Sequence, residues 1–343
     1  MSIYALYNNI LSSPNKWKYY SRMNVSPADC NVDYLFANEE NARHFIEKYF
    51  EAGNKLSVFS STIGVLENRW RHTLSVFLMG IELSKSLGVD LSEEDEWHNK
   101  PNLYHWFLTC LYHDYGYTIE KNPRSYPPFG LSIRKLFSGR LNGTQYLRIK
   151  TGEGEFSNSI RWKYYDFCRN HLGFINHGII GGLLLYNQLS ENLDRIVRVN
   201  GGQKDFVDAS TCLHYSIKHK KDFAICADAI IAHNIWFNVA PFPELKLHST
   251  DKHTYKKWLT ALLILCDTLE PLKAFPCCPP ISVLEYIDYN LSRDCLCVAG
   301  NNPHCDYAAY INKCASFQDW TYVSCDYRTT NSITLNDIRK LYL

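Results

Sequence analysis

The chain has 343 residues, of which 46% are hydrophobic, and its formal net charge is +1. A chain of this length can bury one large core or two modest ones, and we expect one main domain with appended segments. Proteins that act on duplex nucleic acid usually carry a basic excess or a basic face, so the near-neutral charge argues against such a partner. A small charged substrate is compatible with this composition.

The cysteines and the hydropathy pattern predict a soluble cytoplasmic protein. The chain has 13 cysteines, an odd number, and several lie in apolar helical runs where cysteine acts as a small hydrophobe. Neither Cys277 with Cys278 nor Cys295 with Cys297 has CxxC spacing, so a zinc ribbon is not expected. The start of the chain lacks the basic and apolar segments of a signal peptide. The most apolar later run, Gly178 to Tyr186, is much shorter than the ~20 residues of a membrane span. We therefore predict reduced thiols and no membrane partner.

The first part of the chain predicts helices. Residues 1–60 are expected to form a small helical segment, with one helix near Glu39 to Phe50. A long helix is predicted from Val65 to Leu87, and His72 lies on its apolar face. Gly88 follows this pattern immediately and is expected to end the helix.

The next amphipathic helix contains LTCLYHDYGY and delivers the adjacent pair His113 and Asp114 to its inner end. After it, residues 121–165 contain frequent prolines and glycines that break helical periodicity and predict an irregular surface insertion. Its basic residues either fold over a central site as a phosphate-binding lid or form a solvated loop. They are Arg134, Lys135, Arg140, Arg148 and Lys150.

Three later helices each carry one polar group on an apolar face. His177 begins the first of them, and Asn176 is its expected N-cap. His233 lies on a helix predicted from Phe223 to about Trp236, and Asp267 lies on a helix from Trp258 to Leu269. Residues 276–343 are expected to form a small α+β extension, with β-like runs CLCVA and WTYVSC and a helix-like end, NDIRKLYL.

Each of these polar groups is a weak signal alone, because a single buried histidine is more often a hydrogen-bonded core residue than a ligand. Together they place four imidazoles and two carboxylates on the buried faces of five helical segments. Burying such groups without partners costs on the order of several kcal/mol each, whereas a metal ion would bind them as ligands. A nitrogen and oxygen set without thiolates suits divalent Mn, Fe, Co, Ni, Zn or Mg, and argues against a closed structural zinc site.

The order of these residues resembles the H…HD…D pattern of the HD-domain metal-dependent phosphohydrolase superfamily. The contexts WRHTLSVFLMG, FLTCLYHDYGY and LLILCDTLEP are similar to its motifs and contain His72, the His113–Asp114 pair and Asp267. Two further histidines, in INHGIIGGLLL and IIAHNIW, stand where binuclear members carry additional ligands. The resemblance covers roughly Val65 to Pro271. It implies a mostly α-helical fold, with an HD-type bundle over residues 61–275.

The resemblance also implies a division of the ligands between one or two divalent metal ions. A first ion would be held by His72, His113, Asp114 and Asp267. A second ion would be held by Asp114, as a bridge, with His177 and His233. The implied reaction is hydrolysis of a nucleotide or another small phosphoester by a metal-activated hydroxide. Catalytic roles are then expected for Asp114, Arg71 and Lys121, and phosphate-binding roles for Arg134, Lys135 and Arg140.

Two positions depart from the family pattern. Many members carry lysine three residues after the HD aspartate, where this chain has Tyr117. Asn234 stands where members with a five-coordinate second site often carry a paired histidine. An alternative hypothesis is therefore an HD-fold module that senses a nucleotide with little or no turnover. A third hypothesis, a nuclease acting on single-stranded ends, is opposed by the neutral charge. The sequence carries no signal of oligomeric state.

Overall fold

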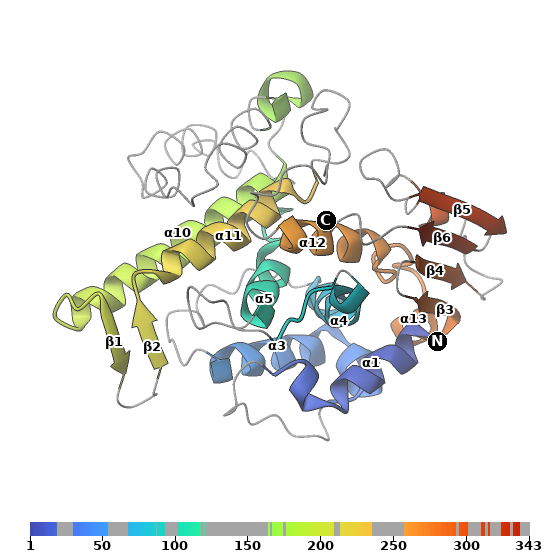
Figure 1. The fold of residues 1–343 in the computed structure, drawn as a ribbon, viewed down its shortest axis with the longest axis horizontal. Helices are drawn as coiled ribbons and strands as arrows, with labels where there is room; N and C mark the ends of the chain where they lie inside the picture. The colour runs from blue at the N-terminus through green and yellow to red at the C-terminus, as the bar shows by residue number, and fades with distance from the viewer. Residues whose placement is uncertain are drawn as a thin grey trace.

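The computed structural model describes residues 1–18, 30–53, 68–86, 88–92, 102–117, 120, 164, 167–173, 176–208, 213–234, 257–292, 295–300, 310–312, 315, 324–329 and 332–336. Within these residues the fold is mostly helical, with a small antiparallel sheet near the C-terminal end (Figure 1). The predicted fold class is confirmed. The predicted insertion at 121–165 lies outside the described residues apart from Tyr164.

The centre of the molecule is built from α4 (Trp70–Ser86), α5 (Asn102–Tyr112) and α12 (Lys257–Leu269), which pack on one another. Two further helices, α10 (His177–Val199) and α11 (His219–Ala232), run side by side along one flank (Figure 1). Helix α11 packs against both α5 and α12. This arrangement brings the polar ends of α4, α5, α10, α11 and α12 towards one region.

The N-terminal helices pack on the other side of α4. They are α1 (Ile3–Leu11), the short 3₁₀ turn η1 (Pro14–Lys16), α2 (Val32–Ala37) and α3 (Glu39–Gly53). The buried Tyr7 hydroxyl donates to the backbone oxygen of Ser75 at 2.9 Å and so joins α1 to α4. The helix predicted near Glu39 to Phe50 is confirmed as α3.

The C-terminal element combines one helix with a sheet in the strand order β3-β4-β6-β5. Its elements are α13 (Pro280–Tyr286), β3 (Ile287–Leu291), β4 (Cys295–Gly300), β5 (Ser324–Thr329) and β6 (Ser332–Asn336). The CLCVA run forms β4 as predicted, whereas the sequence did not predict β6. The WTYVSC run enters the described residues only at its end, in β5. NDIRKLYL lies outside them except for Asn336, which ends β6.

The N-terminal and C-terminal segments meet in space. Ser2 forms a β-bridge with Asp288 of β3, and α1 packs against α13. The Tyr289 backbone N–H donates to the Met1 oxygen at 2.9 Å. The predicted boundary at 275/276 falls in the turn between α12 and α13, and the predicted boundary at 60/61 lies outside the described residues.

The helix ends follow the predicted signals at two positions. Gly88 has a φ of +73°. The Val89 backbone N–H donates to the Ser84 backbone oxygen at 3.0 Å, which is the hydrogen bond of a Schellman C-cap. Asn176 caps α10 by accepting from the Gly178 N–H at 2.7 Å. The prediction for α11 is less accurate, because the helix begins four residues before Phe223 and ends at Ala232.

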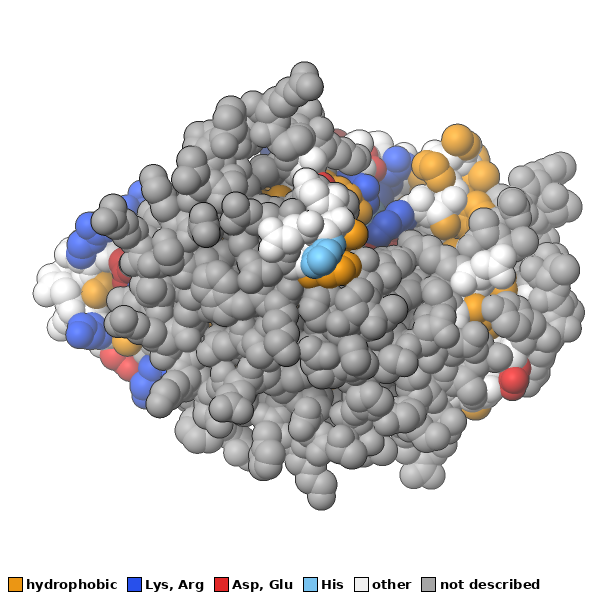
Figure 2. Space-filling view, turned by 90° about the horizontal axis from the view of Figure 1, so that it is seen from above, with side chains coloured by type: hydrophobic (Ala, Val, Ile, Leu, Met, Phe, Trp, Pro, Cys, Tyr) orange, Lys and Arg blue, Asp and Glu red, His pale blue; other side chains and the backbone are white. Residues whose placement is uncertain are grey.

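Two further features complete the fold. The strands β1 (Asp205–Asp208) and β2 (Leu213–Ser216) form an antiparallel hairpin between α10 and α11. Side chains of both charge signs lie on the face of this end that Figure 2 shows. None of the helices in the described part of the chain combines the length and apolar character needed to span a membrane.

Candidate metal centre

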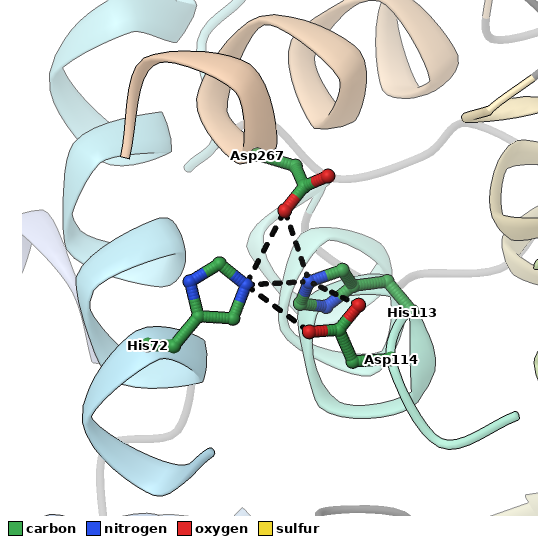
Figure 3. Close-up of side chains that lie close together, drawn as sticks. All are labelled: His72, His113, Asp114 and Asp267. Atoms are coloured by element: carbon green, nitrogen blue, oxygen red, sulfur yellow. Dashed lines mark hydrogen bonds and ion pairs between the residues drawn. The ribbon is translucent and has the colours of Figure 1, made fainter. Parts of the chain in front are cut away.

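Four of the predicted ligands converge at the centre of the helical bundle (Figure 3). His72 comes from α4, His113 and Asp114 follow α5 directly, and Asp267 comes from α12. The His72 Nε2 lies 3.1 Å from His113 Nε2, 3.2 Å from an Asp114 oxygen and 3.3 Å from an Asp267 oxygen. All four residues are buried. The structure therefore brings together the four residues predicted to hold a first ion.

A second group shares Asp114 with the first and adds His177 and His233. The Asp114 Oδ1 lies 3.8 Å from His177 Nε2. The Asn234 amide nitrogen lies 2.7 Å from His177 Nε2 and 2.8 Å from His233 Nε2, so Asn234 reaches both rings. Asp114 is thus placed between the two groups, as a bridging ligand would be.

Close helix packing through glycines brings the second group to the first. A Cβ on Gly116, in the turn after Asp114, would lie 2.0 Å from the His177 oxygen. A Cβ on Gly178 would lie 2.7 Å from the Ile230 oxygen of α11. Because no real side chain fits these gaps, glycine at both positions allows the start of α10 to approach the HD turn and α11.

All four histidines are oriented in the same way. In each ring Nδ1 is hydrogen-bonded to an acceptor outside the cluster, and Nε2 points into it. The acceptors are Glu270 Oε2 for His72 and Glu120 Oε2 for His177, each at 2.7 Å, and the backbone oxygens of Cys110 for His113 at 2.7 Å and Ile230 for His233 at 2.6 Å. An acceptor at Nδ1 places a proton there and makes Nε2 the nitrogen that faces the cluster, which is the orientation found in most histidine–metal sites.

The Asp114 carboxylate has one oxygen with partners and one without. Its Oδ2 accepts from the Arg69 guanidinium at 2.8 Å. Its Oδ1 is buried and accepts no hydrogen bond from the described residues. A buried carboxylate oxygen without a donor is costly, and a cation at this position would satisfy it.

The electrostatics of the centre favour a bound positive charge. Burial alone would lower the pKa of His72, but hydrogen bonds to three carboxylates outweigh burial and raise the pKa to about 10. Burial would raise the pKa of Asp114, but the neighbouring histidines and Lys273 hold it well below its usual range. Burial and the nearby His177 lower the pKa of His233 to about 3. The centre therefore contains ionised carboxylates and a field that stabilises a proton or a metal ion.

The residues present fit a divalent metal ion. Their candidate ligand atoms lie within 4.8 Å of one another in each group, and they are nitrogen and carboxylate oxygen atoms. This donor chemistry suits Mn, Fe, Co, Ni, Zn or Mg.

Two cations at the centre were not predicted from the sequence. Arg69, just before α4, pairs with Asp114, and Lys273, after α12, lies 2.7 Å from an Asp267 oxygen. Their side chains are 19% and 21% exposed, whereas the carboxylates they contact are 5% and 9% exposed. The sequence could have indicated both cations, because each lies within six residues of a predicted ligand: Arg69 near His72, and Lys273 near Asp267 of the DTLEP motif.

Tyr117 stacks between Arg69 and a predicted ligand. Its ring lies 3.6 Å from the His177 ring, centroid to centroid, with an interplanar angle of 17°. The Arg69 guanidinium lies 4.8 Å from the same tyrosine ring. Tyr117 thus supports the orientation of two groups at the centre but contributes no positive charge there.

The predicted catalytic and phosphate-binding residues are not brought together in the same way. Arg71 lies next to His72 in sequence, but its guanidinium pairs with Glu39 of α3 at 2.9 Å and not with the cluster. This position does not support the predicted catalytic role of Arg71. The arginine that lies beside the cluster is Arg69. Lys121 lies outside the described residues, as do Arg134, Lys135 and Arg140, and their roles stay predictions.

Comparisons of the chain with protein-family models, curated proteins and solved structures found no match. The interpretation of this centre therefore depends on its own geometry: the orientation of four histidines, the shared aspartate and the buried carboxylate oxygen without a donor.

Proposed function

We propose that this chain is an HD-type metal-dependent phosphohydrolase or phosphodiesterase that acts on a nucleotide or another small phosphoester. The observation that carries the proposal is the position of Asp114, whose two oxygens face histidines of both ligand groups. A carboxylate shared by two sets of buried histidines is the arrangement that a binuclear hydrolytic centre requires. The order of ligands along the chain supports the same assignment.

Divalent ions, when bound, supply a Lewis acid for phosphate oxygens and lower the pKa of water towards ~7. The residues of the chain hold the ligand atoms in place and exclude bulk water. Glu270 and Glu120 keep Nε2 of His72 and His177 directed inwards through their hydrogen bonds to Nδ1. Because these hydrogen bonds fix the two rings, their Nε2 atoms need little reorganisation to act as ligands.

Metal analysis of the purified chain, followed by a panel of nucleotides and generic phosphoesters, tests the proposal. We expect up to two metal ions per chain and hydrolysis that depends on them. The double variant H113A/D114A should lose both, because it removes ligands of both groups. His44→Ala is the control, since His44 is exposed on α3. Unchanged metal content and hydrolysis in the double variant would exclude the proposed function.

A second candidate is a nucleotide-sensing module with little or no turnover. It is favoured by Tyr117, which stacks on His177 at the position where the resemblance leads one to expect a lysine. Tight, metal-dependent nucleotide binding with no product formed in the presence of any of several divalent metals would favour this candidate over the hydrolase.

A further inference from the structure

Lys273 is placed to contact an anion at the metal centre. It lies in the turn that follows α12, and its Nζ is 2.7 Å from Asp267 Oδ1. That oxygen also lies 3.3 Å from His72 Nε2 and 3.6 Å from His113 Nε2. The ammonium group is therefore adjacent to the ligand atoms of the first group, while the lysine side chain keeps 21% of its surface exposed. It lies between the buried ligands and the solvent.

The position of Lys273 is fixed by the same carboxylate that orients His72. Glu270 is buried, and its Oε2 accepts from the Lys273 backbone N–H at 3.0 Å and from His72 Nδ1 at 2.7 Å. Its Oε1 accepts from the Leu272 backbone N–H at 2.9 Å. One side chain thus couples the orientation of a predicted ligand to the path of the turn.

Lys273 also supplies a charge that position 117 does not. The resemblance leads one to expect a lysine there, and Tyr117 contributes an aromatic ring stacked on His177 instead. The Lys273 ammonium, 2.7 Å from Asp267 Oδ1, supplies a positive charge beside the first group.

We propose that Lys273 is the substrate-binding cation of this centre and contacts a non-bridging oxygen of a phosphate group, in the role that a lysine at position 117 would otherwise have. The inference rests on the proposed function. Arg69, paired with Asp114 Oδ2, provides a second positive charge beside the same centre. With metal ions bound to the carboxylates, both cations would be available to an incoming phosphate, to which charge-assisted hydrogen bonds are strong.

The test compares Lys273→Met, Lys273→Arg and the control Lys85→Met in the full chain loaded with metal. Lys85 is exposed on α4 and pairs with Glu82, so its replacement removes the same charge away from the centre. For each protein the metal content is measured, and the affinity for inorganic phosphate is measured by titration calorimetry. We expect Lys273→Met to keep its metals and to bind phosphate about tenfold or more weakly. Lys273→Arg should retain part of the affinity, and Lys85→Met all of it.

The outcomes separate the two proposals. If Lys273→Met binds phosphate as tightly as the unaltered chain, Lys273 is only a counter-ion of Asp267 and the inference fails while the proposed function stands. If the unaltered chain holds no metal, or holds metal but binds no phosphate, the proposed function itself fails.

A measurement on the unaltered chain avoids any folding defect of the variants. Lysines are acetylated with an N-hydroxysuccinimide ester in the presence of metal, with and without inorganic phosphate, and the modified sites are quantified by mass spectrometry. We expect phosphate to slow acetylation of Lys273 and to leave Lys85 unaffected. Equal labelling of Lys273 under both conditions would overturn the inference.

Discussion

Two buried groups of histidine and aspartate side chains lie near opposite ends of α5 in the described part of the chain. At the end of the helix, His113 and Asp114 join the candidate metal centre. Near its start, His105 Nε2 lies 2.8 Å from an Asp222 oxygen, and His219 Nδ1 lies 3.2 Å from the other oxygen. His105 and Asp222 are fully buried.

The two groups differ in how their polar atoms are satisfied. Both carboxylate oxygens of Asp222 have a histidine partner within the protein, so this group forms a closed link between α5 and α11. In the candidate centre, several Nε2 atoms face one another and Asp114 Oδ1 has no donor among the described residues. Burial of histidine and aspartate therefore does not by itself identify a ligand site. The candidate centre differs in that histidine and carboxylate atoms of five helical segments converge there around a buried carboxylate oxygen that lacks a donor among the described residues.

The largest effect is expected from Asp114→Asn, which keeps the shape of the bridging residue and removes its charge. We expect metal content to fall and metal-dependent hydrolysis to decrease by about three orders of magnitude or more, because both ligand groups lose a shared anion. Metal analysis and steady-state kinetics measure both effects. Asp33→Asn is the control, since Asp33 is exposed on α2. Full activity in Asp114→Asn would show that the candidate metal centre does not differ in function from the group of His105, Asp222 and His219.

Asp222→Ala should give the opposite pattern. It leaves two buried histidines without their acceptor, and breaking a buried pair of this kind destabilises a protein by about 3 kcal/mol. Chemical denaturation should show this loss, while the metal content of the remaining folded protein stays unchanged. Loss of metal without loss of stability would show that the group of His105, Asp222 and His219 also belongs to a ligand site.

The sequence predicted which of these residues converge because each was expected on, or at the end of, the apolar face of a helix, where a period of 3.6 residues specifies which side chains point inwards. His72, His113 and Asp267 were identified in this way. The supporting groups were harder to predict. Lys273 lies in an irregular turn after Pro271, and the pairing of His105 with Asp222 joins residues 117 positions apart. Neither a turn nor such a long-range pair leaves a periodic signal in the sequence.

A smaller effect is expected from Glu270→Gln. The glutamate accepts hydrogen bonds from His72 Nδ1 and from two backbone N–H groups, and an amide has only one accepting oxygen. We expect metal affinity to fall by about 10- to 100-fold, as for other residues that orient a ligand histidine. Competition with a chelator measures the change. Glu47→Gln is the control, because Glu47 only pairs with Arg43 on the surface of α3 and should change neither metal affinity nor stability appreciably.

Gly116→Ala tests whether the two ligand groups depend on each other through the close approach of α10. The new Cβ would lie 2.0 Å from the backbone oxygen of His177, which cannot move without shifting the start of α10. We expect a destabilisation of about 1–3 kcal/mol and loss of metal from the second group, because His177 moves away from Asp114. The first group should keep its metal, since His72 and Asp267 do not depend on α10.

The matched control for that change is Gly88→Ala. Gly88 has a φ of +73°, and no atom of the described residues lies within 4 Å of an added Cβ, so alanine there is strained but meets no neighbour in that part of the chain. It should cost about 1–2 kcal/mol in stability and leave both ligand groups intact. Metal stoichiometry and thermal unfolding of the two variants then separate a general loss of stability from a displacement of His177. If Gly116→Ala retains two metals per chain, or loses both at once, the two groups do not respond separately and the role assigned to the close approach of α10 is wrong.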